Sequence, residues 1–325
     1  MVPEIAGQQE KRPLILNSWS MTTPVLFDTD IGSDIDDAVA LAYLLTQPEC
    51  NLLGITTVSG EPHRRAALAR ALCRVGGQPD VSIHVGLEAP LLAVPLQPHA
   101  PQAEVLGAGA LTEFENRPTA VDFLRETIRA RPGEITLLAT GPLTNLGVLF
   151  ALDPEIPALL KQVVLMGGVF HGRSIIHTQA TGGEWNMRCD PEAAALVFNA
   201  PVPRLLAVGL DVTEQCVMAS QEVREKFTSA GPPLDFVLTL AEVWFRHTGK
   251  ITFHDPLAAT LIFEPGLCRT ERQRIEVDTN GTRTEGQTFF HADAAEKPHE
   301  IAVSVDAPAF FAHYFDIVSG KRMSG

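Results

Sequence analysis

Short apolar runs rich in Val, Ile, Leu and Thr recur along the chain after Met21, and most are followed by a longer segment with helical character. Runs of this kind are typical of strands that are buried on both faces of a sheet. The predicted strands are Val25–Thr29, Asn51–Val58, Val81–Val85, Glu134–Thr140, Gln162–Met166, Arg204–Val208, Arg274–Asp278 and Glu300–Val305.

The intervening segments predict helices over Ala38–Leu45, Arg64–Val75, Val121–Arg131, Leu143–Ala151 and Asp190–Phe198, and helices dominate from Gln221 to Phe263. A Pro-rich segment, Pro90–Pro101, is expected to cross the fold without regular structure. Strand–helix alternation predicts an α/β fold with a mostly parallel central sheet flanked by helices. Because there is no internal repeat and no clear linker, we expect one domain over residues 23–325 after a disordered N-terminal tail, residues 1–22.

Composition narrows the classes of partner. The 325 residues are 45% hydrophobic and 20% charged, which is ordinary for a globular protein with a large core. With 39 acidic and 25 basic residues the net charge is -14, which disfavours nucleic acid and anionic membranes and suits small neutral or cationic ligands. Five scattered cysteines without a CxxC pair, and no signal-peptide core or membrane-length apolar run, predict a cytoplasmic protein with reduced thiols.

An aspartate-rich turn follows the first predicted strand and precedes the first helix. Its five carboxylates, within ten residues, are Asp28, Asp30, Asp34, Asp36 and Asp37. Clustered like charges in a pocket repel one another, and a hard divalent cation with oxygen ligands removes that repulsion. The alternative is a solvated acidic loop in which Asp36 or Asp37 favours the helix N-terminus.

Three further segments carry polar groups at predicted strand or helix ends. They are the residues Phe253-His254-Asp255-Pro256, Gly182-Gly183-Glu184-Trp185-Asn186, and Ala139-Thr140-Gly141-Pro142-Leu143-Thr144-Asn145. Taken alone, each is compatible with a structural role, since an Asp N-cap followed by Pro is a common helix start. In a parallel α/β sheet, however, the carboxyl ends of the strands form the ligand-binding edge.

In order and spacing, these segments resemble the inosine-uridine preferring nucleoside hydrolase family. The resemblance runs from Pro24 to about Ser319 and includes Met166-Gly167-Gly168 and the helix start Asp190-Pro191-Glu192-Ala193-Ala194. It implies a nucleoside hydrolase-like fold with a Rossmann-like core. It also implies hydrolysis of the N-glycosidic bond of ribonucleosides to ribose and free base by a calcium-bound water, in a homodimer or homotetramer.

The resemblance implies a role for each matching residue. Asp30 would be both a ligand of the single Ca²⁺ and the general base. The remaining ligands would be Asp37, the Thr140 carbonyl and Asp255. Asp36, Glu184 and Asn186 would hold the ribose hydroxyls, and His254 would protonate the departing base.

The sequence departs from the family pattern in three places. The aspartate turn is two residues longer than its commonest form, so Asp34 competes with Asp36 for the ribose. Glu61 follows Gly60, where many members have Asn. The loop Val169–Gly183 is longer than usual, with Ser174 or Thr178 near the place of a sugar-binding Asn.

Two further side chains near these segments, Trp185 and His99, are candidates for the binding site. Trp185 is either a stacking surface for base or sugar or a half-buried packing residue. His99, in the Pro-rich crossover, occupies a region where the family often has a pocket histidine.

Two other functions remain as alternatives. Phe27-Asp28-Thr29-Asp30 after a strand also resembles the start of a haloacid dehalogenase-like phosphatase, with Asp28 as nucleophile and magnesium as cofactor. That family does not require the segments around Glu184 and His254, and release of inorganic phosphate from sugar phosphates would favour it. A non-catalytic ribonucleoside-binding protein is the second alternative, motivated by Glu61 and the altered loop.

Overall fold

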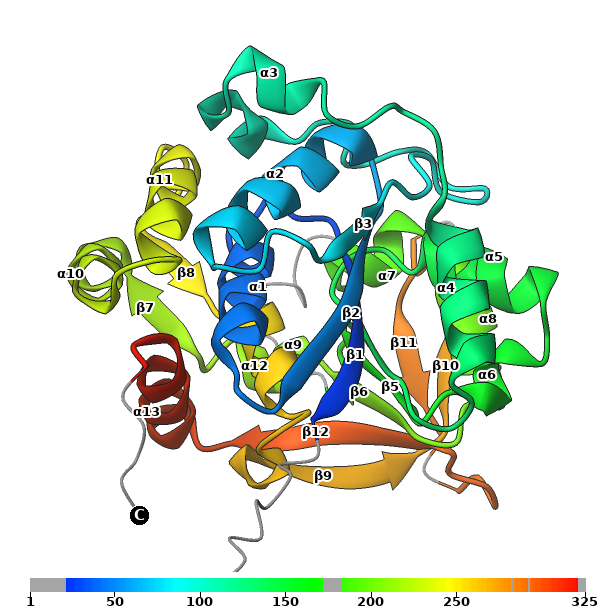
Figure 1. Ribbon diagram of the computed structural model, residues 1–325. Coiled ribbons are helices and arrows are strands. Elements are labelled where there is room, and N and C mark those ends of the chain that lie inside the picture. Colours follow the sequence, from blue (N-terminus) through cyan, green and yellow to red (C-terminus); the bar gives the residue numbers. More distant parts are fainter. Residues whose placement is uncertain (1–21, 172–182, 282, 292, 321–325) are drawn as a thin grey trace, which may run out of the picture.

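The computed structural model describes residues 22–171, 183–281, 283–291 and 293–320 (Figure 1). The predicted tail lies outside these ranges except for its last residue, so its extent stays a prediction. Ser174 and Thr178 also lie outside the described residues.

An eight-stranded sheet forms the centre of the molecule, in the order β3-β2-β1-β4-β5-β6-β12-β9. Every neighbouring pair is parallel except β12 and β9. The mostly parallel sheet predicted from the sequence is therefore confirmed. Its strands are β1 (Thr23–Thr29), β2 (Cys50–Thr57), β3 (Ser82–His84), β4 (Thr136–Ala139), β5 (Gln162–Met166), β6 (Leu205–Val208), β9 (Cys268–Gln273) and β12 (His299–Val305).

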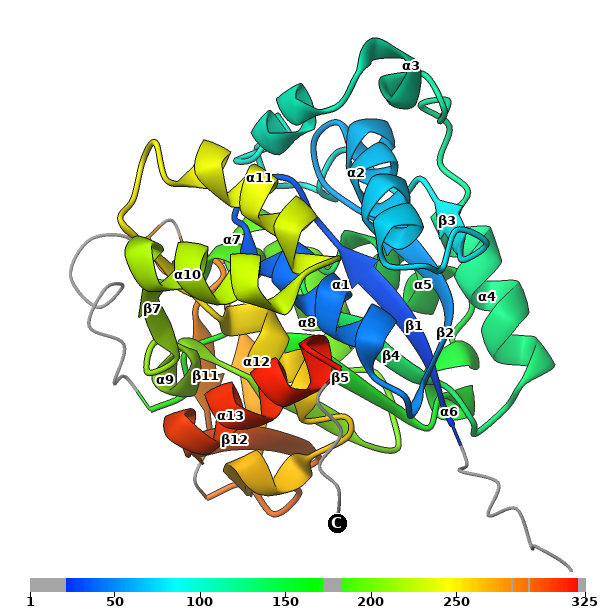
Figure 2. The ribbon, with the colours of Figure 1, turned by 60° about the vertical axis from the view of Figure 1, so that its left-hand side comes forward.

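Helices cover both faces of this sheet (Figures 1 and 2). Successive side chains of β1 enter different cores: Val25 and Phe27 pack in one hydrophobic cluster and Leu26 in the other. The first cluster includes residues of α1 (Asp36–Thr46), α2 (Pro62–Val75), α10 (Ser220–Ala230), α11 (Leu234–Trp244), α12 (His254–Thr260) and α13 (Ala307–Val318). The second includes residues of α4 (Ala120–Ala130), α5 (Thr144–Leu152), α6 (Ile156–Leu159) and α8 (Pro191–Phe198).

Two small antiparallel ribbons lie outside the main sheet. The first consists of β7 (Val217–Ala219) and β8 (Lys250–Thr252). Helices α10 and α11 lie between these strands in the sequence, so the pairing of β7 with β8 brings the two ends of this helix pair together. The predicted strand at residues 274–278 is β10 (Ile275–Val277), which pairs with β11 (Thr288–Phe290) and not with the main sheet.

The Pro-rich crossover has no helix or strand before a short 3₁₀ turn, Pro101–Val105, as expected. The remaining short elements are α3 (Ala108–Leu111), α7 (Trp185–Cys189), α9 (Leu210–Thr213) and a 3₁₀ turn at Pro265–Leu267. All five cysteines are free thiols, as predicted. Among the described residues, we find no helix with the length and apolar character needed to span a membrane.

Candidate active site

The order of the central strands reverses between β1 and β4, whose carboxyl ends lie side by side. Ligands of open α/β sheets bind at such a reversal. Asp30 follows β1 directly and Thr140 follows β4, and the Thr140 N–H donates to the Asp28 carbonyl at 2.9 Å. The aspartate turn and the Thr140 turn, far apart in the sequence, therefore meet at the expected edge of the sheet.

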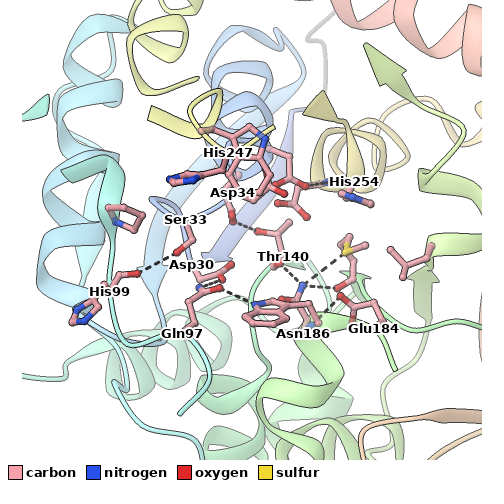
Figure 3. Close-up of a pocket in the computed structure, with 18 of the residues that line it drawn as sticks. Asp30, Ser33, Asp34, Gln97, His99, Thr140, Glu184, Asn186, His247 and His254 are labelled. Carbon is pink, nitrogen blue, oxygen red and sulfur yellow. Dashed lines mark hydrogen bonds between the residues drawn. The ribbon is translucent and has the colours of Figure 1, made fainter. Parts of the chain in front are cut away.

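A cavity of about 560 Å³ opens at this edge, within the size range of small-molecule sites (Figure 3). Polar groups at the ends of β1 and β4 line it together with apolar and aromatic groups from α9 and α11. Ten residues that the sequence singled out for the site line this cavity: Asp30, Asp34, Asp36, Asp37, Thr140, Glu184, Trp185, Asn186, His254 and Asp255.

Three carboxyl groups converge where the first turns of α1 and α12 meet. Asp36, Asp37 and Asp255 each offer one oxygen, and these oxygens lie within 4.8 Å of one another. The Asp255 N–H donates to Asp36 Oδ2 at 3.3 Å. The hydroxyls of Thr29 and Thr140 donate to Asp37 Oδ1 at 2.5 and 2.8 Å. The tightest trio thus contains Asp36, where the family resemblance implied Asp30.

The electrostatics of this trio fit a divalent cation. All three residues are buried, and burial, followed by the charges of neighbouring carboxylates, raises the pKa of Asp36, Asp37 and Asp255 well above the usual range. Carboxylates in this state bind either protons or a cation. A donor set made of oxygen atoms suits a hard ion such as Ca²⁺ or Mg²⁺.

Arg65, a buried guanidinium near the trio, has its donors committed elsewhere. Its Nε donates to the Gly60 carbonyl at 2.8 Å, and its Nη2 donates to the His99 carbonyl at 3.0 Å. Its Nη1 donates to the Asp30 and Ile31 carbonyls and to the Ser33 hydroxyl. Arg65 therefore fixes the backbone of the aspartate turn, and its hydrogen bonds do not reach the carboxylates of the trio.

Asp30 and Asp34 lie on the same turn in different environments. Asp30 is buried, and Gln97 Nε2 donates to its Oδ2 at 2.5 Å. Asp34 is half-buried, and its Oδ1 accepts from the Ile35 N–H at 2.5 Å. Desolvation, followed by the charges of Asp37 and Asp30, raises the pKa of Asp34 to about 7. Asp34 and Asp36 both line the cavity, so each can reach a bound ribose.

Glu184 and Asn186 fix the opposite wall. Glu184 caps α7: its carboxylate accepts from the N–H groups of Asn186, Met187 and Gly168 at 2.9, 3.0 and 3.2 Å. The Asn186 amide donates to the Thr140 carbonyl at 2.6 Å and to the Met166 carbonyl at 3.2 Å. Because a carbonyl oxygen has two lone pairs, Thr140 keeps one acceptor site for a further ligand.

His254 begins α12 and lines the cavity beside Asp255. Its Nδ1 lies 2.7 Å from the Thr213 hydroxyl on α9, which fixes the orientation of the ring. The apolar and aromatic part of the lining comes from Leu210, Val243 and Trp244, with His247 just beyond α11. This part suits a flat heterocycle, and a histidine at its border can donate a proton to it.

Gln97, Arg65 and His247 are site residues that sequence reasoning did not single out. Gln97 is a polar residue among the prolines of the crossover, which was a weak signal. Arg65 lies in a helix with several other arginines, and His247 follows a helix whose partner cannot be deduced from local pattern. Their roles depend on tertiary contacts. His99 does line the cavity, as its position in the crossover suggested.

Asp28 and Glu61, on which the two alternative functions drew, lie outside the cavity lining. Asp28 is fully buried, its Oδ2 accepts from Thr56 Oγ1 at 2.5 Å and from Asn145 Nδ2 at 2.7 Å, and burial raises its pKa to about 7. A phosphatase nucleophile has to be ionised and reach its substrate, so Asp28 is unsuited to that role. Glu61 accepts from the Ala100 N–H at 2.9 Å and pairs with Arg64, so it holds the crossover.

Comparison with known proteins gives a consistent assignment. The sequence model described as "Inosine-uridine preferring nucleoside hydrolase" matches residues 25–312. A probable uridine nucleosidase 2 of Arabidopsis thaliana is 30% identical over 88% of this chain and 94% of its own length. A pyrimidine-specific ribonucleoside hydrolase RihA of Citrobacter koseri is also 30% identical, over 89% of this chain and 96% of its own.

Solved structures agree with the sequence comparisons. A purine-preferring ribonucleoside hydrolase from Gardnerella vaginalis superimposes with a TM-score of 0.76 at 26% identity, covering 92% of this chain and 98% of that one. A plant nucleoside hydrolase shares the fold with a TM-score of 0.76 at 24% identity, covering 91% of this chain and 99% of that one. The chain therefore belongs to the inosine-uridine preferring nucleoside hydrolase family and is a hydrolase of N-glycosyl bonds.

Proposed function

We propose that this hydrolase splits ribonucleosides into ribose and free base in the cavity at the ends of β1 and β4, with one Ca²⁺ held by Asp30, Asp37, the Thr140 carbonyl and Asp255. The observation that carries the proposal is the buried group of carboxyl oxygens where α1 and α12 meet, which contains Asp37 and Asp255 of this ligand set together with Asp36. Next to it lie hydrogen-bonding groups suited to a sugar and an apolar wall suited to a base.

The metal supplies one kind of chemistry. When bound, Ca²⁺ would polarise a water molecule and coordinate sugar hydroxyls. The residues that would hold it supply only oxygen atoms, and this favours calcium over the softer transition metals.

The protein's own groups perform the remaining steps. Asp30 accepts a proton from the attacking water as the water oxygen bonds to C1′ of the ribose. Asp36, Glu184 and Asn186 orient the ribose hydroxyls, and the burial of Asp36 and Glu184 strengthens these contacts. The C1′–N bond breaks with its electron pair on the base nitrogen, and His254 donates a proton to the departing base.

The function is tested by measuring free ribose from a panel of purine and pyrimidine ribonucleosides, with calcium and after chelation. We expect turnover of at least one ribonucleoside, loss of turnover on chelation, and recovery when calcium is restored. Inorganic phosphate from sugar phosphates serves as the control for the phosphatase alternative. Tight nucleoside binding without ribose release under all conditions would contradict the proposal.

Replacing His254 by alanine is expected to separate two kinds of substrate. Activity on inosine or uridine should fall roughly 10²-fold, in the range of general acid catalysis. A nitrophenyl riboside, whose leaving group needs little protonation, should be largely unaffected. The measurement is kcat/KM on both substrates. An equal decrease on both would mean that His254 only positions the start of α12.

We also propose a cellular location and an oligomeric state for this protein. Its free cysteines support a cytoplasmic location, and the resemblance supports a homodimer or homotetramer. Relatives with pyrimidine-specific and purine-preferring names both match, so the ribonucleoside panel includes both kinds of base.

A further inference from the structure

We propose that Gln97 is a positioning residue for Asp30, and that Trp185 fixes the orientation of the Gln97 amide. The inference rests on the proposed function, in which Asp30 is the general base. Gln97 lies in the Pro-rich crossover, a segment without helix or strand that is distant in the sequence from the aspartate turn.

The hydrogen bonds of the Gln97 amide define its orientation. Gln97 Oε1 accepts from Trp185 Nε1 at 2.8 Å, and Gln97 Nε2 donates to Asp30 Oδ2 at 2.5 Å. An indole N–H can only donate, so the amide oxygen has to face Trp185. The amide nitrogen must then face Asp30. The three side chains form a chain of hydrogen bonds with one permitted direction. Figure 3 shows Gln97 beside Asp30.

The backbone that carries Gln97 is held against the turn after β2. The Ser59 hydroxyl donates to the Gln97 carbonyl at 3.4 Å, and Glu61 accepts from the Ala100 N–H at 2.9 Å. Gly60 packs so closely below the crossover that a Cβ there would come within 2.4 Å of the Gln97 carbonyl oxygen and the Pro98 backbone. Gln97 is therefore presented to Asp30 by a fixed segment.

The same contacts explain what Glu61 does. Its backbone has a positive φ of 56°, its side chain accepts from the crossover, and it is not part of the cavity lining. The residue that departs from the family pattern thus anchors the segment from which Gln97 donates to Asp30.

Fixing Asp30 matters because the two oxygens of its carboxylate have different surroundings. Oδ2 is bound to Gln97, whereas Oδ1 lies on the side of Gly141, where a Cβ would approach it to 2.9 Å. A group that accepts a proton in the transition state has to point one oxygen at the proton, and small misplacements can lower the rate by up to about 10²-fold. Without Gln97, Oδ2 loses its amide donor and the rotation of the carboxylate is restrained less.

The test compares Gln97→Met, which keeps the length of the side chain and removes the donor, with Trp185→Phe and the double variant. We expect kcat to fall roughly 10- to 100-fold in Gln97→Met, with KM changed by less than about threefold. The reason is that the lost interaction is with the general base, Asp30, and not with the substrate. Trp185→Phe should have a smaller effect on kcat. The double variant should match Gln97→Met, since both act through one chain of contacts.

Gln78→Met is the matched control. Gln78, like Gln97, donates a hydrogen bond from its side-chain amide, but its acceptor is the Leu45 carbonyl at 2.7 Å and it lies outside the cavity lining. Its kinetic constants should equal those of the wild type.

A readout independent of turnover is the indole N–H signal of Trp185 in NMR spectra, assigned with Trp185→Phe among the three tryptophans. We expect this proton signal to move upfield in Gln97→Met, as a lost hydrogen bond requires. Because Asp30 is also a proposed calcium ligand, calcium affinity measured by titration calorimetry should fall by up to about 10²-fold in Gln97→Met, and kcat is therefore compared at saturating calcium. An unchanged kcat in Gln97→Met, a raised KM at constant kcat, or an unmoved indole signal would overturn the inference. A wild type that releases no ribose would instead overturn the proposed function, and the indole signal would still test the contact.

Discussion

Asp37→Ala is expected to abolish calcium binding and to lower ribose release by about 10³-fold or more, because a bound metal contributes several kcal/mol of transition-state stabilisation. Asp37, a member of the proposed ligand set, is buried and accepts from the hydroxyls of Thr29 and Thr140. The variant should nevertheless fold, since removing one of several clustered carboxylates relieves their mutual repulsion. Calcium is measured by elemental analysis and calorimetry, and folding by circular dichroism.

The matched control for this prediction is Asp122→Ala. Asp122 is an exposed residue of α4 that pairs with Arg125 on the surface, so its loss should leave calcium content and activity unchanged. Stoichiometric calcium in Asp37→Ala would show that the proposed ligand set is wrong.

The second large effect concerns the sugar. The wild type should turn over 2′-deoxyribonucleosides about 10⁴-fold less efficiently than ribonucleosides, because a site built to hydrogen-bond a hydroxyl is left with unmatched buried polar groups. We expect Asp36 to be the buried polar group that loses its partner when the 2′-hydroxyl is missing, since it is buried next to Asp37 and Asp255. The measurement is kcat/KM for uridine and deoxyuridine.

Two variants then decide which aspartate holds the ribose. Asp36→Ala should remove most of the discrimination between uridine and deoxyuridine, whereas Asp34→Ala should keep it. Asp34 is half-buried, and one of its oxygens already accepts from the adjacent Ile35 N–H. The opposite ranking would assign the ribose to Asp34, and equal turnover of both nucleosides by the wild type would contradict a hydroxyl-binding site altogether.

The buried strands of the sheet could be predicted because their apolar runs are local properties of the sequence. β5 begins and ends at the predicted residues, Gln162–Met166. β9 was missed because its sequence, CRTERQ, is mostly polar. Such a composition is typical of an edge strand that has solvent on one side, and it carries no apolar period. α13 was also missed, although Asp306 caps it by accepting from the Ala309 N–H, a signal that the sequence contains.

The site residues were predictable where short motifs carry them. The aspartate turn, the Thr140 turn, the Glu184 segment and the start of α12 each occur as a compact motif, and all of them line the cavity. Gln97 and Arg65 could not be assigned in this way, because their roles exist only once the crossover lies on the β2–α2 turn. The membership of Asp36 in the carboxylate trio likewise depends on how α1 packs against α12, a contact between segments more than two hundred residues apart.

Arg65 has a consequence for how the aspartate turn meets a metal ion. Its guanidinium is a permanent positive charge beneath the turn, and its planar fork reaches several carbonyls at once, which a lysine ammonium cannot do. These contacts hold the aspartate turn in shape without the help of an ion. An ion that enters a preformed turn does not have to order it, so its binding free energy is not reduced by the conformational entropy of loop folding.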